Sequence, residues 1–113
     1  MRTDLYHISP TVNNESIERR GVDPTYSLGK LQTMYYVDEK RLFWAMLHIS
    51  RRHQCPIDQL TVHVLPLYRK DMIKTGLDGV YRSNLPLFPA SREPATNFVT
   101  KDPFEASLNA FDH

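Results

Sequence analysis

The sequence has a single cysteine, Cys55, and no long apolar run among its 113 residues. One cysteine cannot close an intramolecular disulfide, which argues against a small secreted fold held together by cystines. The longest nearly apolar stretch, Leu42 to Leu47, is far shorter than a membrane-spanning helix. The first residues lack the apolar segment of a signal peptide. We therefore expect a cytoplasmic protein that has no membrane partner.

The sequence also lacks an excess of either charge, because 14 Lys and Arg residues stand against 13 Asp and Glu residues. Without an overall field, only a local basic patch could attract nucleic acid or an anionic membrane. Aromatic residues, in contrast, are numerous: five Phe, six Tyr and one Trp give enough bulk for a small core. We expect one domain over residues 1–113, with its core at about 5–90.

The spacing of hydrophobic residues predicts the order of the secondary-structure elements. The expected strands lie at 5–8, 34–37, 60–65 and 79–82, with a marginal edge strand at 85–88. The expected helices lie at 13–20 and 39–53, with at most one helical turn at 69–74. The segment 91–113 is predicted to be an irregular C-terminal tail that can include a short helix at 103–111. This order predicts an α+β fold.

The spacing of the polar residues gives two candidate binding sites. The first group, His48, His53, Cys55 and His63, lacks the close ligand pairs of a zinc site, so we predict no metal. The second group lies on the side of the 39–53 helix opposite its apolar stripe and consists of Lys40, Trp44, His48 and Arg51. It is either a surface that contacts phosphates or stacks on bases, or a solvated face with cations at the helix end. A solvated face does not explain why a tryptophan, Trp44, lies on it, unless the Trp44 side chain packs under the C-terminal tail.

A third candidate site comes from two predicted strands that each carry adjacent polar aromatic residues. Side chains alternate along a strand, so Tyr6 and His7 point to opposite faces, as do Tyr35 and Tyr36. If the two strands are neighbours, one His and one Tyr share a face that borders a cleft, while the other two tyrosines enter the core. The alternative is that the histidine is a hydrogen-bonded part of the scaffold.

The order of short motifs resembles that of the ADP-ribosyltransferase superfamily over about residues 5–90. Leu5-Tyr6-His7-Ile8-Ser9 resembles the family's first strand, which carries Tyr-His-Gly followed by Ser or Thr. A helix that ends on Arg20-Gly21-Val22 follows, and then Met34-Tyr35-Tyr36-Val37-Asp38 resembles the second motif strand. The later segments 60–67, 69–72 and 78–81 and Leu85-Pro86 resemble the back half of tRNA 2′-phosphotransferase domains. The resemblance implies a split β-sheet with flanking helices.

The resemblance also implies roles for individual residues toward NAD+ as a substrate, without a metal. The ring of His7 would bond ribose hydroxyls, the backbone of Ile8 and the hydroxyl of Ser9 would hold the nicotinamide carboxamide, and Tyr35 would stack on nicotinamide. Ile8 stands where the family usually has Gly, which narrows the pocket. Tyr35, where the phosphotransferases have His, indicates the His-Tyr branch of the superfamily.

The third catalytic position of the family is a Glu at the head of a later strand, and here the candidates are Asp78 and Glu93. Asp78 is nearer to the expected place but one methylene shorter, and it can equally begin an Asp-Gly turn. The expected function is NAD+-dependent ADP-ribosyl transfer to a protein or nucleic-acid acceptor that the sequence does not identify. The alternatives are a non-catalytic module that binds NAD+, ADP-ribose or a partner, and an RNA 2′-phosphotransferase-like activity.

Overall fold

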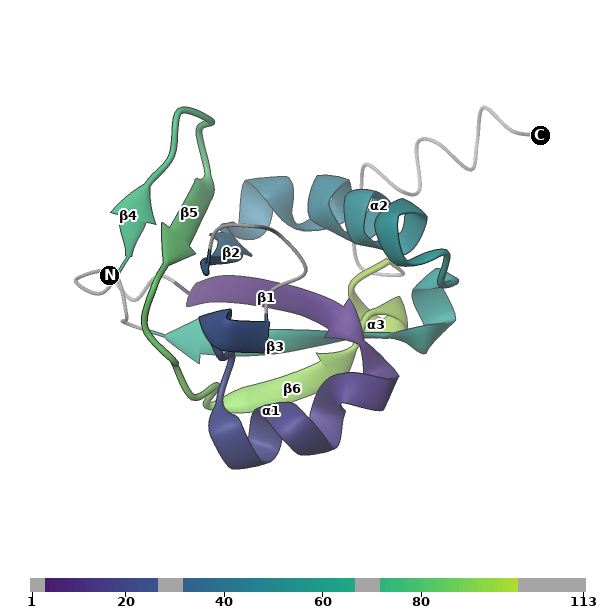
Figure 1. Cartoon of the computed structure of the whole chain (residues 1–113). Coiled ribbons are helices and arrows are strands. Elements are labelled where there is room, and N and C mark those ends of the chain that lie inside the picture. The colour runs from purple at the N-terminus through teal and green to yellow at the C-terminus, as the bar shows by residue number, and fades with distance from the viewer. Residues whose placement is uncertain (1–3, 27–31, 67–71, 100–113) are drawn as a thin grey trace.

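Six strands form one antiparallel sheet in the order β4-β5-β2-β1-β3-β6, in a computed structural model that describes residues 4–26, 32–66 and 72–99 (Figure 1). The strands are β1 (Asp4–Pro10), β2 (Met34–Val37), β3 (Leu60–Pro66), β4 (Ile73–Lys74), β5 (Val80–Ser83) and β6 (Ser91–Pro94). The α-helices of the described residues are α1 (Asn14–Arg20), α2 (Leu42–His53) and α3 (Thr96–Val99). The chain is thus a small α+β domain, as predicted, and its sheet is antiparallel.

The sheet is joined unevenly on the two sides of its central strand, β1. On one side, β1 pairs with β3 along its whole length, from Asp4 opposite Pro66 to Pro10 opposite Leu60. On the other side, β1 pairs with β2 at one position alone, Tyr6 opposite Val37. Beyond that position β1 and β2 form no further pairs, so the sheet opens between them.

Hydrophobic side chains cover both faces of the sheet, and a helix packs on each face (Figure 1). On the α2 face, Phe43 and Met46 of the helix pack with Ile8, Val37 and Val62 of the strands. On the α1 face, Ile17 packs with a second buried group, Leu5, Val22, Tyr36, Leu65 and Leu87. The alternation of side chains along each strand explains this division, because odd and even residues of β1 belong to different clusters.

The two longer helices begin and end much as their sequence predicts. The Asp38 side chain accepts a hydrogen bond from the backbone N–H of Arg41, so it caps a 3-10 turn (Glu39–Arg41) that leads into α2. Gly21 follows α1 with a φ of 73°, and a Cβ there would lie 2.8 Å from the carbonyl oxygen of Leu87. Only glycine fits this close approach without strain.

Several expected boundaries were wrong because tertiary pairing overrides local signals. β1 continues through Pro10, which pairs with Leu60, although Ser9-Pro10 was expected to end it. The expected strand at 85–88 is a single bridge between Val22 and Leu87. Ile73 and Lys74 form β4 where a helical turn was expected.

The segment 91–99, predicted to belong to an irregular tail, forms β6 and α3 instead. β6 contains no hydrophobic residue, so nothing in its composition indicated a strand. It forms because Ser91–Pro94 pairs with β3 at the edge of the sheet. The short helix considered at 103–111 lies outside the described residues. Within the described ranges, no helix is both long and apolar enough to cross a membrane.

Candidate functional site

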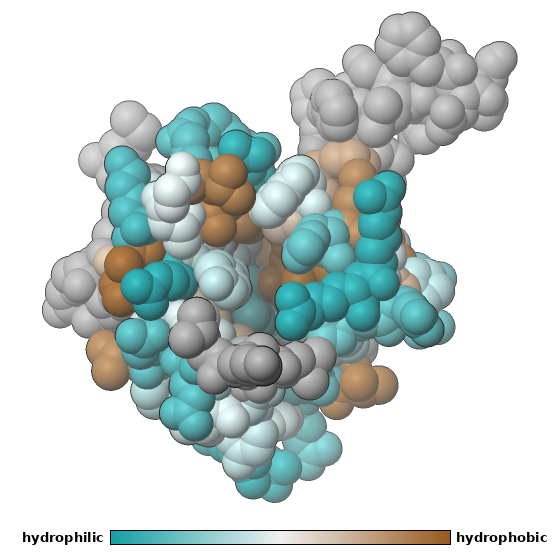
Figure 2. Space-filling model, turned by 45° about the horizontal axis from the view of Figure 1, so that its top comes forward, coloured by the Kyte–Doolittle hydropathy of each residue, from teal (hydrophilic) through white to brown (hydrophobic). Residues whose placement is uncertain are grey.

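A cavity of about 930 Å³ lies where β1 and β2 separate. Such a volume is at the upper end of the range of small-molecule sites, about 300–1,000 Å³. Figure 2 shows the molecule from the α2 side, where hydrophobic side chains lie within a hollow bordered by hydrophilic ones. The cavity is lined from β1 by residues 6–10, from β2 by Met34, Tyr35 and Val37, from the α1 side by Ser16, Ile17, Gly21 and Val22, and from α2 by Trp44, Ala45, His48, Ile49, Arg52 and His53.

The opening of the sheet explains why residues from both of its faces line one cavity. Through the Tyr6–Val37 pair, strand alternation places His7 on the same face as Tyr36, and their ring centroids are 5.5 Å apart. Tyr35 follows the opposite alternation and is 53% exposed, whereas Tyr36 is 1% exposed. In a continuous sheet, His7 and Tyr35 would lie on separate surfaces. Because β1 and β2 diverge, both line the cavity.

His7 fastens β1 to β2 at the edge of this opening. Its Nδ1–H donates a hydrogen bond of 2.9 Å to the backbone carbonyl of Tyr35. A carbonyl can only accept, so the proton of the neutral ring lies on Nδ1 and Nε2 is an acceptor. Loss of solvent around the ring lowers the pKa of His7 below its usual value, which favours this neutral form. A ligand hydroxyl could therefore donate to Nε2.

Behind His7 lies a second histidine that belongs to the scaffold. His63 of β3 is opposite His7, with ring centroids 6.3 Å apart, and its Nε2 is 3.4 Å from the Oγ of Ser9. Burial lowers the pKa of His63 to about 4, and the nearby His7 and Arg92 act in the same direction. His63 is thus neutral at physiological pH and helps to hold the Ser9 side chain. Ile8 and Ser9 are both buried and both line the cavity.

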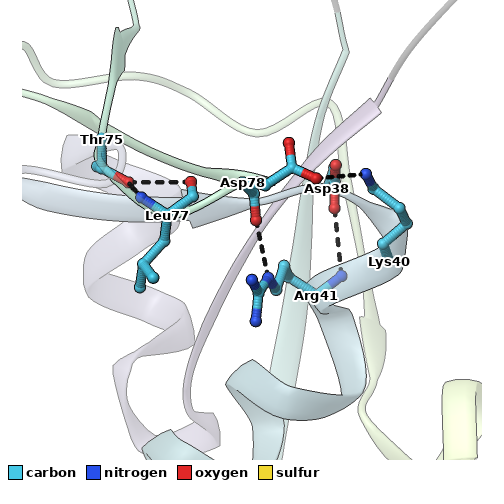
Figure 3. A network of polar contacts seen from close by, with 6 residues as sticks. All are labelled: Asp38, Lys40, Arg41, Thr75, Leu77 and Asp78. Carbon is cyan, nitrogen blue, oxygen red and sulfur yellow. Dashed lines mark hydrogen bonds and ion pairs between the residues drawn. The ribbon is translucent and has the colours of Figure 1, made fainter.

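Asp78 takes part in a polar network that holds the β4–β5 turn against the start of α2 (Figure 3). Its carboxylate accepts a hydrogen bond of 2.8 Å from Lys40 Nζ, and its backbone carbonyl accepts one of 2.8 Å from Arg41 Nε. The hydrogen bond from Lys40 is the main cause of the lowered pKa of Asp78. Leu77 and Val80 line the cavity on either side of Asp78, which itself does not.

Two other carboxylates, Glu93 and Asp23, differ in their position relative to the cavity. Glu93 of β6, which lies on the far side of β3 from β2, borders a separate depression with Asp4, Tyr6 and Ser91. Among the described residues, Asp23 is the sole carboxylate that lines the cavity, and its Oδ1 accepts hydrogen bonds from the backbone N–H and the hydroxyl of Thr25. Of the family-implied residues, the structure thus gathers His7, Ile8, Ser9 and Tyr35 around the cavity and leaves Asp78 at its rim.

The polar residues of α2 and of the 3-10 turn before it differ in whether they line the cavity. Trp44, His48, Arg52 and His53 line the cavity, whereas Lys40 and Arg51 do not. The sequence analysis therefore named the aromatic residues of this face, Trp44 and His48, correctly as neighbours. It named Arg51, whereas Arg52 is the arginine that lines the cavity. Helical spacing from Trp44 and His48 could have indicated Arg52, which is four residues after His48. Within the described part of the chain, no three His, Cys, Asp or Glu residues are grouped so as to hold a metal ion.

Comparison of the chain with protein-family models, with curated proteins and with solved structures found no match.

Proposed function

We propose that this protein binds NAD+ in the cavity between β1 and β2 and transfers its ADP-ribosyl group to an acceptor. The observation that carries the proposal is the hydrogen bond from His7 Nδ1 to the Tyr35 carbonyl at the mouth of the opening. It joins the two positions that the superfamily resemblance assigns to NAD+, and it leaves the Nε2 of His7 as an acceptor. The cavity volume of about 930 Å³ suits a ligand as large as a dinucleotide.

In the proposed complex, Nε2 of His7 accepts a hydrogen bond from a ribose hydroxyl of NAD+. The exposed ring of Tyr35 stacks on nicotinamide, and Ser9 bonds the carboxamide. The bond between the ribose C1′ and the nicotinamide nitrogen breaks, and nicotinamide leaves with the electron pair. A nucleophilic atom of the acceptor forms the new bond to C1′ and loses its proton to solvent. The chain's contribution is to hold these groups in line and to exclude water.

A carboxylate beside the ribose would stabilise the positive charge that develops at C1′. Asp78 is the candidate, since Leu77 and Val80 next to it already line the cavity. To act there, its carboxylate would have to exchange the exposed Lys40 partner for the ligand. Surface ion pairs of this kind contribute little to stability, so this exchange carries a small penalty.

The ion pair between Asp78 and Lys40 also favours a second candidate function, a module that binds NAD+ or ADP-ribose without transfer. In this alternative, Asp78 serves the fold alone, by fastening the β4–β5 turn to α2. The third alternative, removal of an RNA 2′-phosphate in an NAD+-dependent reaction, rests on the sequence resemblance of the back half.

The test measures thermal unfolding and nicotinamide release in parallel. NAD+ at about ten times its Kd should stabilise the wild-type protein by about 1.4 kcal/mol, which raises the melting temperature by several degrees. Tyr35→Ala should abolish the rise. Phe88→Ala is the matched control, because Phe88 is also about half exposed (51%) but does not line the cavity. An unchanged melting curve of the wild type at millimolar NAD+ would overturn the proposal.

Chromatography of the reaction mixture separates transfer from binding. If Asp78 takes part in the reaction, Asp78→Asn should retain the thermal shift and lose the release of nicotinamide. Binding without any release of nicotinamide by the wild type, unaffected by Asp78→Asn, would favour the non-catalytic module. Loss of phosphate from a 2′-phosphorylated RNA only when NAD+ is present would favour the third alternative.

A further inference from the structure

The outer face of α2 carries a column of flat side chains beside the mouth of the cavity. The guanidinium carbon of Arg41 lies 5.4 Å from the Trp44 ring centroid, and the His48 ring is stacked on Trp44 at 5.6 Å with an interplanar angle of 6°. These residues are three and four positions apart, so the helix aligns them along its axis. We call Arg41, Trp44, His48 and Arg52 the α2 column.

The α2 column is exposed although the indole ring at its centre is costly to leave in water. Trp44, the only tryptophan of the chain, is 43% exposed, and His48 and Arg52 are exposed as well. The His48 side chain is therefore accessible to a further flat group. A tryptophan that serves only the fold would be buried against the core, as Phe43 and Met46 of the same helix are.

The column is continuous with the cavity, and a second aromatic–arginine pair reaches the cavity from the segment after α1. Trp44, His48 and Arg52 line the cavity from α2, and Tyr26 lines it from the segment after α1. Arg20 lies over the Tyr26 ring, 4.8 Å from its centroid. The cavity lining thus includes two aromatic rings, Trp44 and Tyr26, that are each paired with a guanidinium group.

Positive groups outnumber negative ones at the border of the cavity. α2 contains no acidic residue between Leu42 and His53, and it ends on Arg51, Arg52 and His53. Among the described residues, Asp23 is the one carboxylate of the cavity lining, and Thr25 already donates to it. The carboxylate of Asp23 is thus the one negative charge in the described lining, and the guanidinium groups of Arg20, Arg41 and Arg52 outnumber it around the mouth, which favours a polyanion.

We propose that the acceptor in the proposed reaction is a single-stranded nucleic acid, which binds along the α2 column. One base adds to the stack at the exposed His48 ring, and Arg52 contacts the adjoining phosphate. A single strand fits because its bases are free to stack on aromatic side chains, whereas those of a duplex are covered by their neighbours. The strand would then present a neighbouring nucleotide to the cavity, where NAD+ is proposed to bind. This inference rests on the proposed function for its chemistry.

The test is fluorescence anisotropy with labelled oligothymidylate and oligouridylate, which distinguish a DNA from an RNA strand. The wild type should bind at least one of them and should bind the matching duplex more weakly. Trp44→Ala should weaken binding about tenfold, because it removes the centre of the stack. Arg52→Ala should lower the slope of log affinity against log salt by about 0.7, the value for one phosphate contact.

Two exposed residues outside the cavity lining supply matched controls. Arg19→Ala removes a cation from α1, and Phe88→Ala removes an aromatic ring. Neither should alter the affinity for the strand by as much as twofold. An unchanged affinity of Trp44→Ala, or equal binding of an abasic strand that has phosphates and no bases, would overturn the stacking proposal.

The thermal shift with NAD+ separates the failure of this inference from that of the proposed function. If the wild type is stabilised by NAD+ but binds neither oligonucleotide, the nucleic-acid acceptor is wrong and the proposed NAD+ site stands. If Trp44-dependent strand binding occurs without any effect of NAD+, the proposed reaction is wrong, and with it the role of the strand as acceptor. Mass spectrometry of the strand after incubation with NAD+ should show one added ADP-ribosyl group.

Discussion

The two edges of β1, one toward β3 and one toward β2, differ in how completely they are paired. Toward β3 the strand forms a ladder of seven residue pairs, and Ser9 of β1 and His63 of β3 are buried there. Toward β2 it forms one residue pair. Beyond that pair, a hydrogen bond from the His7 side chain to the Tyr35 carbonyl connects the two strands. The closed side fixes the geometry of β1, and the open side leaves backbone and side chains available to a ligand. Mutations on the closed side should therefore lower the free energy of unfolding, whereas mutations on the open side should affect ligand binding.

The largest difference is expected between Leu65 and Tyr35. Leu65 of β3 is fully buried, so Leu65→Ala should lower the free energy of unfolding by about 2–5 kcal/mol. Tyr35 is 53% exposed, so Tyr35→Ala should change it by no more than about 0.5 kcal/mol. Urea unfolding measures both values. A loss for Tyr35→Ala as large as that for Leu65→Ala would mean that the open side is part of the scaffold.

The closed side should also respond to acid through His63. The unfolded ring takes up a proton near pH 6.5, whereas burial lowers the pKa of the folded ring to about 4. Below pH 6.5 the unfolded state therefore binds more protons, so stability falls as the pH drops toward 4, by about 3 kcal/mol in total. Urea unfolding at successive pH values should show the decline. His63→Gln should remove most of it, and an equal decline in that variant would exclude His63 as the cause.

The packing of the turn before β5 against the start of α2, at the rim of the open side, should require a glycine at position 79. Gly79 has a φ of 80°, and an added Cβ would lie 2.6 Å from the Oδ1 of Asp38, which caps the start of α2. Gly79→Ala should therefore destabilise the protein by about 1–3 kcal/mol. Gly76 in the same turn region has nothing within 4 Å of an added Cβ, so Gly76→Ala is the control. Equal melting temperatures of the two variants would contradict the close packing at this point.

The smallest effect is expected at the ion pair between Asp78 and Lys40. Both side chains are exposed, so Lys40→Ala should lower the melting temperature slightly, and high salt should remove the difference from the wild type. A large loss that persists in high salt would show that this pair, rather than the backbone hydrogen bonds around it, holds the β4–β5 turn to α2.

The sequence was sufficient to predict the elements that bury a periodic hydrophobic face. β2 and β3 and the helices α1 and α2 lie close to their predicted ranges, because their apolar residues, Asp38 and Gly21 carry strong local signals. β4 and β6 were not predicted: β4 has only two residues and is defined by its pairing with β5, the next strand of the chain, and β6 forms at the other edge by pairing with β3, which is distant in the sequence. Such pairings depend on tertiary context, which short local patterns do not contain.

The candidate site was predictable in its parts and not in its arrangement. Alternation correctly separated Tyr35 from Tyr36, and the exposures of the two rings confirm it. It could not reveal that β1 and β2 diverge after one pair, which is what brings His7 and Tyr35 to one cavity. The ion pair of Asp78 with Lys40 was equally hidden, because 38 positions separate the two residues.

A crystal structure of the protein with NAD+ would show whether the open side of β1 is an NAD+ site. We expect the nicotinamide ring against the side chain of Tyr35 and a ribose hydroxyl within hydrogen-bond distance of His7 Nε2. NAD+ bound at another surface, or a cavity that stays free of it at millimolar NAD+, would contradict the account.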